Sequence, residues 1–572
     1  MCGIAGVLGA ADEAKAAALI APLAHRGPDG IRVEAVGKTA LAHARLSIID
    51  LEHGWQPLHA AGSTVVGNGE IYNYLELIEE FGLKDRLSTG SDFEPLLHLY
   101  ALEGEKAFDR LRGMYAFCLV GGDGRTWLVR DRFGIKPLYW RREADGRVLF
   151  SSELRNLKEP APRLAPRRVE QLLALNYTID PGVAHQASIF EGVARLPPGC
   201  NLLVTPEGVE PHRPVPPALA PPSDAQDAVT LVDKVLEDSV RVHQRSDVPY
   251  GVFLSGGVDS SIVAALMARL NARPVTAFTC GFDAPSARDE RAAAEKVARA
   301  LDLDWRETVF DQADFWRIAP LVAAALDDPT TDYAALPTYK LAEAAKGTLK
   351  VVLTGEGGDE IFAGYGRYRR GLRPRWMGGR PAEPRVDAPF LKDGGRAALQ
   401  AWRRAVPDLP GASRLTRMQM ADIHTWLPND LLLKLDRCLM AHGLEGRTPF
   451  LDSAVATLIG LPDDLKVRDG YGKWILRKWL ERHCPAADPW AKKKGFTVPV
   501  ADWIAPRAAD LGPRIAAVRG VAEACDSDAV RRVFADEKGA PYRWRLMFYA
   551  LWWTVHVGGA TAAEAAEAVG LQ

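Results

Sequence analysis

A proline-rich segment divides the 572-residue chain into two unequal parts. From Pro211 to Pro222 the sequence PHRPVPPALAPP places six prolines in twelve residues. Proline lacks a backbone N–H donor and does not continue a helix or a central strand, so this segment is expected to be a linker. A chain of this length is also too long for a single hydrophobic core. We therefore predict a domain over 2–205, a linker over 206–225 and a second domain over 226–572.

Short strand-like runs, separated by glycine- and aspartate-rich turns, dominate the part before the linker. The clearest of them cover 40–49, 115–120, 126–130 and 148–151, and a helix is predicted over 93–102. This order predicts an α+β domain built on antiparallel sheets between helices.

Strands and helices alternate in the part after the linker. An amphipathic stretch around 231–240 is followed by a series of predicted strands and helices at 250–254, 262–270, 275–279, 290–301, 313–346 and 350–354. Alternation at this spacing predicts an α/β domain with a doubly wound parallel sheet. From about residue 420 onward the pattern is mainly helical.

Charge and cysteine content exclude several classes of function. Lys+Arg (71) and Asp+Glu (73) nearly cancel, so no overall charge favours nucleic acid or an anionic membrane. No apolar run reaches the ~18 residues of a membrane span, and the seven scattered cysteines lack CxxC or zinc-ligand spacing. We therefore expect a cytoplasmic protein without a disulfide framework. The arginine-rich stretch 367–375 is interpreted as a solvated or phosphate-facing loop rather than an RNA site.

Cys2 becomes the first residue when the initiator methionine is removed. A free N-terminal cysteine combines a nucleophile with a base, because its α-amine, of pKa near ~8, can accept the thiol proton. The alternative is that a small second residue merely permits removal of the methionine.

Two glycine-rich loops follow apolar strands in the second domain. The first, LSGGVDSS, covers 254–261 and opens a helix, where backbone N–H groups and hydroxyls suit an anion. It lacks the lysine of a Walker A loop. The second, LTGEGGDE, covers 353–360, and both should lie at the carboxyl edge of the parallel sheet. Asp259 and Asp359 would then face each other across phosphate groups, and such oxygen ligands suit Mg²⁺.

Five motifs before the linker carry a family resemblance: MCGIAG, HRGPDG, RLSIID, NGEIYN and TGSD, in this order. Together they resemble the glutaminase domain of class II, N-terminal-nucleophile amidotransferases. The resemblance implies that the Cys2 thiolate attacks glutamine, and that the Asn68 side chain and the Gly69 N–H stabilise the oxyanion. It further implies that Arg45 binds the substrate carboxylate and that Asp92 and Glu70 bind its ammonium group. The alternative for Arg45 and Asp92 is a surface ion pair.

The loop LSGGVDSS resembles the pyrophosphate loop of ATP pyrophosphatases, which cleave ATP to AMP and pyrophosphate. The resemblance implies the following contacts to ATP: Leu254, Ser255, Gly256, Gly257, Asp259, Ser260, Cys280, Thr354 and Gly355. Glu356 would support adenylate formation and attack by ammonia, and Lys473 would neutralise charge on the phosphates. From the sequence alone Lys473 would pass for a solvent-facing helix lysine.

A glutaminase followed by an ATP pyrophosphatase is the layout of the glutamine-hydrolysing (B-type) asparagine synthetases, which the chain resembles over roughly 2–555. The resemblance implies a carbon–nitrogen ligase that makes asparagine from aspartate and glutamine. The reaction would pass through a β-aspartyl-adenylate and release AMP, pyrophosphate and glutamate. It further implies ATP and Mg²⁺, an internal ammonia tunnel, no nucleic-acid or membrane partner, and a homodimer as one possible assembly.

The acceptor carboxylate is the least constrained part of this prediction. Ala363, Thr448 and the segments 303–306 and 327–332 depart from the usual family pattern near the acceptor side. They leave open the same chemistry on another carboxylate, such as a secondary metabolite or an envelope sugar acid. Intramolecular amide or macrolactam formation is less favoured, because such enzymes tend to lose the N-terminal cysteine and Cys2 is present. A non-catalytic protein on this scaffold is disfavoured because Cys2, Asp259 and Asp359 are all retained.

Three further segments resemble family segments near the acceptor pocket and the interdomain face. They cover 434–437, 444–452 and 492–496, and no role is assigned to their individual residues. Buried ion pairs are an equally good interpretation of their charges.

Overall fold

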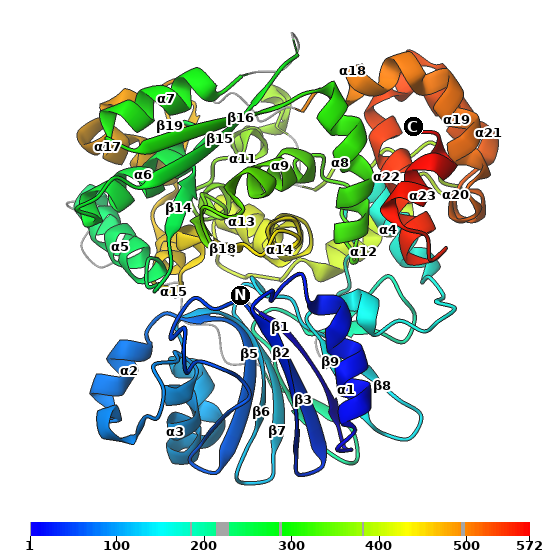
Figure 1. Ribbon diagram of the computed structural model, residues 1–572. Helices are drawn as coiled ribbons and strands as arrows, with labels where there is room; N and C mark the ends of the chain where they lie inside the picture. Colours follow the sequence, from blue (N-terminus) through cyan, green and yellow to red (C-terminus); the bar gives the residue numbers. More distant parts are fainter. Residues whose placement is uncertain are drawn as a thin grey trace.

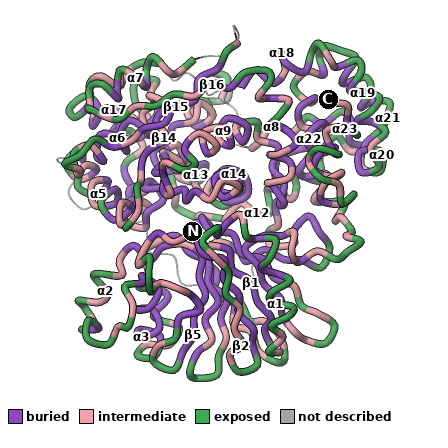
Figure 2. The backbone as a smooth tube through the Cα atoms, viewed as in Figure 1, coloured by how far each residue is buried: buried purple, intermediate pink, exposed green. Residues whose placement is uncertain are grey.

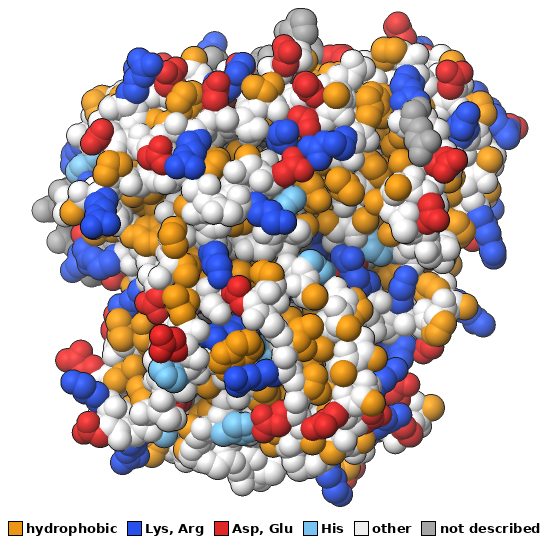
Figure 3. Space-filling view, in the orientation of Figure 1, with side chains coloured by type: hydrophobic (Ala, Val, Ile, Leu, Met, Phe, Trp, Pro, Cys, Tyr) orange, Lys and Arg blue, Asp and Glu red, His pale blue; other side chains and the backbone are white. Residues whose placement is uncertain are grey.

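The computed structural model describes residues 2–182, 186–212, 228–284, 289–379, 383–492 and 498–571. Most of the predicted linker, and most of the predicted segment 492–496, lie outside these residues. Figure 1 shows two lobes, with the N-terminal end of the chain at the junction between them. Figure 3 shows positive and negative side chains interspersed over both lobes on the face in view.

Two antiparallel sheets form the N-terminal lobe. The seven-stranded sheet has the order β10 (Gln186–Ala187), β11 (Ala194–Arg195), β8 (Tyr139–Arg142), β9 (Val148–Ser151), β1 (Gly3–Leu8), β3 (Thr39–Arg45) and β2 (Gly30–Val36). The six-stranded sheet has the order β13 (Val209–His212), β12 (Asn201–Val204), β7 (Thr126–Arg130), β6 (Gly113–Val120), β5 (Ser63–Ile71) and β4 (Leu58–Ala60). The predicted antiparallel α+β fold is confirmed.

The central strands of this lobe are buried on both faces, as the tube in Figure 2 shows. Side chains such as Leu41, Val66 and Cys118 pack between the two sheets. The helix α1 (Glu13–Ile20) covers the outer face of one sheet, and α3 (Glu94–Glu103) covers the outer face of the other. The lobe is therefore a four-layer helix–sheet–sheet–helix stack, with α2 (Tyr74–Glu80) beside α3.

The predicted linker begins inside the second sheet. The strand β13 (Val209–His212) contains Pro211 and pairs with β12 alone, at the edge of the sheet. An edge strand tolerates proline because one of its sides needs no ladder hydrogen bond. The proline-rich composition therefore excludes a central strand here but not an edge strand.

A five-stranded parallel sheet forms the core of the C-terminal lobe. Its order is β16 (Asp304–Phe310), β15 (Thr276–Phe282), β14 (Tyr250–Phe253), β17 (Val351–Leu353) and β18 (Glu445–Arg447). One face packs against α5 (Ala228–His243), α6 (Val258–Leu270), α7 (Arg291–Ala300) and α17 (Trp474–His483). The other packs against α8 (Gln312–Ala325), α9 (Ala335–Ala345) and α14 (Leu432–Met440). Helices on both faces confirm the predicted doubly wound sheet.

The remaining helices complete this lobe and its C-terminal part. They are α10 (Gly358–Ile361), α11 (Gly366–Leu372), α12 (Arg396–Ala405), α13 (Arg414–His424), α15 (Ser453–Ala456), α16 (Asp463–Lys466), α18 (Val500–Ile504), α19 (Ala508–Ala517), α20 (Arg519–Ala524), α21 (Ser527–Ala535), α22 (Ala540–His556) and α23 (Ala562–Val569). A small hairpin, β19 (Val467–Arg468) and β20 (Tyr471–Gly472), precedes α17. The predicted helical character beyond residue 420 is confirmed. No helix in the described part of the chain is long and apolar enough to cross a membrane.

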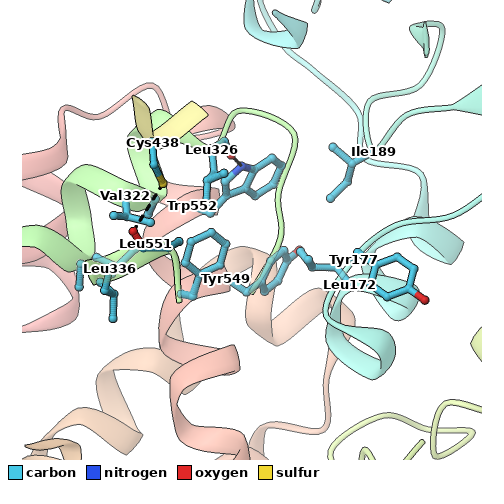
Figure 4. Packing of buried hydrophobic residues seen from close by; sticks show 14 of the residues in the cluster. Leu172, Tyr177, Ile189, Val322, Leu326, Leu336, Cys438, Tyr549, Leu551 and Trp552 are labelled. Atoms are coloured by element: carbon cyan, nitrogen blue, oxygen red, sulfur yellow. Dashed lines mark hydrogen bonds between the residues drawn. The ribbon is translucent and has the colours of Figure 1, made fainter. Parts of the chain in front are cut away.

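Apolar residues join the two lobes. Figure 4 shows Leu172, Tyr177 and Ile189, which precede the linker, near Leu326 and Trp552 of the C-terminal lobe. The Trp552 indole donates a hydrogen bond to the Leu326 carbonyl at 2.9 Å. Burial of side chains of this size favours association of the lobes, at ~25 cal/mol per Å² of apolar surface.

Candidate functional site

Cys2 lies directly before β1, at the junction of the lobes. Its backbone N–H donates to Asn68 Oδ1 at 3.0 Å, and the Leu46 N–H donates to its Sγ at 3.5 Å. Burial raises the pKa of the Cys2 thiol. The other six cysteines are buried, whereas Cys2 is partly exposed. Cys2 is therefore the one cysteine residue of the chain that is not fully buried, and its thiol needs a base to ionise.

Asn68 and Gly69 are adjacent on β5, next to Cys2. Asn68 is buried, and its Nδ2 has no hydrogen-bond partner among the described residues. Gly69 has a φ of 138°, and a Cβ there would overlap the Met114 carbonyl oxygen. Glycine is thus required for the β5–β6 pairing at this point. A buried, unsatisfied donor beside a nucleophile is an arrangement that can stabilise an oxyanion.

The guanidinium of Arg45, at the end of β3, donates to the carbonyl oxygens of Asp50 at 2.5 Å and Leu51 at 3.1 Å. It also lies 4.7 Å from the centre of the Trp55 ring. In the described part of the chain, no carboxylate oxygen lies within 4.0 Å of it. Its charge is therefore available for the carboxylate of a ligand.

Asp92 and Glu70 are both buried in the same lobe. The Ile71 N–H donates to Asp92 Oδ2 at 2.7 Å. Burial, with repulsion from Glu445, nevertheless raises the pKa of Asp92 to about 7. Burial and the neighbouring Asp92 likewise raise the pKa of Glu70 well above its ordinary value. Since Arg45 is buried as well, Arg45 and Asp92 are not a surface ion pair. An ammonium group placed between Asp92 and Glu70 would relieve the repulsion between these two carboxylates.

Arg447 reaches these carboxylates from β18 of the other lobe. Its guanidinium lies 3.2 Å from Glu70 Oε1, donates to Glu445 Oε1 at 2.5 Å and donates to the Arg245 carbonyl at 2.7 Å. Its own carbonyl accepts the Thr354 N–H at 2.9 Å. The sequence segment 444–452 therefore contacts Glu70 of the N-terminal lobe as well as β17 of the parallel sheet and the residue after it.

The two glycine-rich loops of the C-terminal lobe lie side by side, because β14 and β17 are neighbours in the sheet. Gly256 has a φ of 71°, and Ser255 Oγ and Ser260 Oγ are 3.0 Å apart. A Cβ at Gly355 would lie 2.8 Å from the Cβ of Asp259, so the second loop packs directly on the first. The strands that follow β14 in the chain lie first on one side of it (β15 and β16) and then on the other (β17 and β18), so the order of the strands reverses between β14 and β17. Open α/β sheets bind ligands in the crevice outside the carboxyl ends of the strands at such a point.

Lys473 joins the two aspartates at this crevice. Its ammonium group contacts Asp259 Oδ2 and lies 2.7 Å from Asp359 Oδ1. Lys473 is buried and has a φ of 56°, a left-handed conformation at the start of α17. It is therefore not a solvent-facing helix lysine, which was the alternative drawn from the sequence.

Leu254 and Cys280 lie at the carboxyl ends of β14 and β15, and both are buried. Thr354 follows β17 and is also buried. These three residues and the two loops thus meet at one edge of the sheet, as the order of the strands requires.

Glu356 faces a second cluster of charges. Lys434, on α14, lies 2.9 Å from Asp332 Oδ2, and Trp426 Nε1 donates to Asp430 Oδ2 at 2.5 Å. Burial raises the pKa of Glu356, although Lys434 opposes the shift. Burial and Asp332 raise the pKa of Asp430 to about 7. Asp332 and Lys434 belong to the sequence segments 327–332 and 434–437, to whose residues no individual role is assigned from the sequence. Their proximity to Glu356 in the structure is what connects them with a candidate site.

The chain matches the family model for asparagine synthase over residues 231–557 and that for a glutamine amidotransferase domain over residues 1–214. It is 33% identical over 564 residues to a glutamine-hydrolyzing asparagine synthetase of Bacillus subtilis, covering 88% of each chain. It is 32% identical over 652 residues to a putative glutamine-hydrolyzing asparagine synthetase of Mycobacterium tuberculosis, covering 97% of each. It is 30% identical over 526 residues to asparagine synthetase B of Escherichia coli, covering 87% of this chain and 82% of that one. The chain belongs to the family of glutamine-hydrolysing asparagine synthetases.

Proposed function

We propose that this protein is an ATP-dependent amidotransferase that makes asparagine from aspartate and glutamine. The proposal rests most on one observation: a partly exposed Cys2 beside an unsatisfied Asn68 donor in one lobe, and an Asp259–Lys473–Asp359 cluster at the sheet crevice of the other. Family membership supports the same pairing of a glutaminase with a synthetase.

In the glutaminase half, the α-amine of Cys2 accepts the thiol proton after removal of the initiator methionine. The thiolate attacks the glutamine amide carbon, and the oxyanion is stabilised by Asn68 Nδ2 and the Gly69 N–H, a contribution often worth ~3–4 kcal/mol. The ammonium formed at the α-amine returns the proton to the departing ammonia. Water then cleaves the thioester, which yields glutamate and restores the thiol. Arg45 holds the substrate carboxylate, and Asp92 and Glu70 hold its ammonium group.

In the synthetase half, an oxygen of the aspartate β-carboxylate attacks the α-phosphorus of ATP and pyrophosphate departs. Lys473 neutralises negative charge that develops on the phosphates. Ammonia then attacks the acyl carbon of the β-aspartyl-adenylate, AMP departs, and Glu356 accepts the proton released from nitrogen. A carboxylate of raised pKa is a better base than an ordinary one, which supports this role for Glu356.

The residues at the crevice fit a divalent cation. Asp259 and Asp359 converge on one position, and the Lys473 ammonium between them shows that this pair of carboxylates accepts a positive charge. No group of three or more His, Cys, Asp or Glu side chains in the described residues has the arrangement of a metal site, so phosphate oxygens would complete the ligand set. Mg²⁺ held by these two aspartates would shield the phosphate charges from the attacking carboxylate.

The charges around Glu356 support an amino acid as acceptor. An aspartate substrate carries an α-carboxylate and an α-ammonium group in addition to the reacting carboxylate. Lys434 supplies a buried cation, and Asp332 and Asp430 supply carboxylates within the same cluster. A substrate ammonium group would add to the pairing of Asp332 with Lys434 and of Asp430 with Trp426, whereas a sugar acid without an amino group would not. The cytoplasmic location, the homodimer and the ammonia tunnel remain predictions.

The proposed function is tested by supplying purified protein with ATP, Mg²⁺, glutamine and aspartate and quantifying asparagine, AMP, pyrophosphate and glutamate by chromatography. Asparagine, AMP and pyrophosphate should appear in equal amounts. Glutamate without asparagine or AMP would retain the glutaminase and reject aspartate as acceptor. A screen of other carboxylates for AMP release would then identify the substrate.

A further inference from the structure

Arg26 forms hydrogen bonds both to Cys2 and to carboxylates elsewhere in the molecule. It lies shortly after the short helical turn Ala21–Leu23, and its side chain is fully buried. Its Nε donates to the carbonyl oxygen of Cys2 at 3.2 Å, and its Nη1 donates to Glu153 Oε1 at 3.1 Å. After the proposed removal of the initiator methionine, Cys2 would have a covalent neighbour on one side only. Its position therefore depends on non-covalent contacts such as this one.

The other lobe holds the outer end of the same guanidinium. Asp436, on α14, accepts hydrogen bonds from Arg26 Nη1 at 2.8 Å and from Arg26 Nη2 at 3.1 Å. Asp436 Oδ2 also accepts one from Arg437 Nη1 at 2.8 Å. Although burial opposes ionisation, the charge of Arg26 and its hydrogen bonds hold the pKa of Asp436 at about 2. The pair is thus ionised and bidentate, and such a pair fixes the plane of the arginine fork.

The helix α14 therefore contacts both sites. Lys434, two residues before Asp436, faces Asp332 in the cluster around Glu356. Asp436 faces Arg26 and, through it, Cys2. Figure 1 shows α14 at the junction of the lobes, above the N-terminal end of the chain. The glutaminase nucleophile is consequently held in part by a residue of the synthetase lobe.

We propose that Asp436 is a positioning residue for the glutaminase reaction, which fixes Cys2 through Arg26 although it belongs to the synthetase lobe. The inference rests on the proposed function, because it concerns the rate at which Cys2 hydrolyses glutamine. When Asp436 loses its charge, Glu153 is the one carboxylate partner left to the Arg26 fork among the described residues, and the Cys2 carbonyl loses a fixed donor. The glutamine contacts Arg45, Asp92 and Glu70 are separate from this chain of hydrogen bonds.

The test compares Asp436→Asn with a matched control, Asp328→Asn. Asp328 also forms a buried, bidentate pair with an arginine across the lobes, Arg195, but that pair does not contact Cys2. Both variants should lower the melting temperature, since each leaves a buried arginine short of a partner. Only Asp436→Asn should lower the glutaminase kcat, by at least about tenfold with glutamine KM changed by less than about threefold. Its ammonium-dependent synthesis should stay within about twofold of the wild-type rate, since the Glu356 cluster is retained.

Three outcomes overturn the inference. One is a normal glutaminase kcat in folded Asp436→Asn. Another is a loss of glutaminase kcat in Asp328→Asn equal to that in Asp436→Asn. The third is a parallel loss of glutaminase activity and ammonium-dependent synthesis in Asp436→Asn. Either of these last two results would indicate a general loosening of the interface. If Asp436→Asn does not fold, Arg26→Lys tests the inference instead. Lysine keeps the positive charge but lacks the fork that bonds Asp436 and the Cys2 carbonyl at the same time. This variant should show the same selective loss of glutaminase kcat. Failure of the wild-type protein to form glutamate would instead reject the proposed function itself.

Discussion

Two buried carboxylates should determine how the proposed glutamine site responds to pH. The pKa of Asp92 is raised to about 7 by burial and by Glu445, so this group is neutral below that value and charged above it. A neutral Asp92 no longer attracts the ammonium group of glutamine. Binding of glutamine is therefore expected to need the ionised form, which forms only as the pH rises through this value.

The first prediction is that glutamine binds more weakly as the pH falls from about 8 to about 6, approaching a tenfold change per pH unit below the pKa. Calorimetric titration of the Cys2→Ala protein measures this without interference from the thiol. In the same background, Asp92→Asn should bind weakly and show a smaller dependence on pH, because only Glu70, whose pKa is also raised by burial, then titrates next to the ammonium group. Equal affinity of the Cys2→Ala protein at both ends of the range would contradict the assigned role of Asp92.

A departure from the family pattern has a conformational explanation at the same scale. Ala363 stands where glycine is usual in the family that the chain resembles, and it adopts a φ of 57° in the fully buried turn before α11. This left-handed conformation costs roughly 1–2 kcal/mol for a residue with a Cβ and very little for glycine. The departure therefore concerns the backbone of this turn, next to Asp359 and Lys473, rather than a contact made by a side chain.

At the scale of elements, the turn between α10 and α11 packs against two residues of the proposed nucleotide site. Gly364 packs so closely that a Cβ would overlap Asp359 Oδ1 and Lys473 Cε. Gly366, at the start of α11, has a φ outside the left-handed range, and the nearest atom to a Cβ there is Arg369 Nη2 at 3.7 Å. Substitution by alanine at Gly364 should therefore disturb Asp359 and Lys473, whereas the same substitution at Gly366 changes only the chain next to them.

We predict that Gly364→Ala lowers ammonium-dependent synthesis by about a hundredfold, because it displaces Asp359 and Lys473, while glutaminase activity changes by less than about twofold. Gly366→Ala should leave both activities near the wild-type level. Both activities are measured on each purified variant. Equal synthetase rates in the two variants would show that the Asp359–Lys473 arrangement is not needed for the reaction.

The elements that carry the candidate sites could be predicted from the sequence, because their signals are local. The apolar strands predicted at 250–254 and 350–354 are β14 (Tyr250–Phe253) and β17 (Val351–Leu353), each followed by its glycine-rich loop. The two edge strands β16 and β18 were missed. β16 (DWRETVF) is largely polar because it lies at an exposed edge of the sheet. β18 (EGR) has three residues, and two of them are charged. These two charged residues can be buried because they form ion pairs.

At the scale of the whole molecule, the missing information is long-range. Arg26 and Asp436 are 410 positions apart, and Glu70 meets Arg447 across the same interface. Nothing in one sequence indicates which buried charge pairs with which, because the pairing depends on how the two lobes dock. The motifs therefore predicted both candidate sites, whereas the residues that join them required the structure.

Docking of the lobes also leads to a prediction about the path of ammonia. Cys2 lies at the junction of the lobes, and α14 extends from there to the Glu356 cluster. Glutamine labelled with a heavy isotope in its amide nitrogen, in the presence of excess unlabelled ammonium, should give asparagine that is mostly labelled. Mass spectrometry of the product measures the ratio. Complete mixing with the unlabelled ammonium would contradict an internal tunnel.

The central claim is that one chain joins a Cys2 glutaminase to an independent synthetase site, and Cys2→Ala tests it most directly. Asparagine synthesis by this variant is measured with glutamine and, separately, with ammonium as nitrogen donor. The account predicts that glutamine no longer supports synthesis, whereas the ammonium-dependent rate stays close to that of the wild type. If a folded Cys2→Ala protein lost both activities, or still used glutamine, the two-site account would be contradicted.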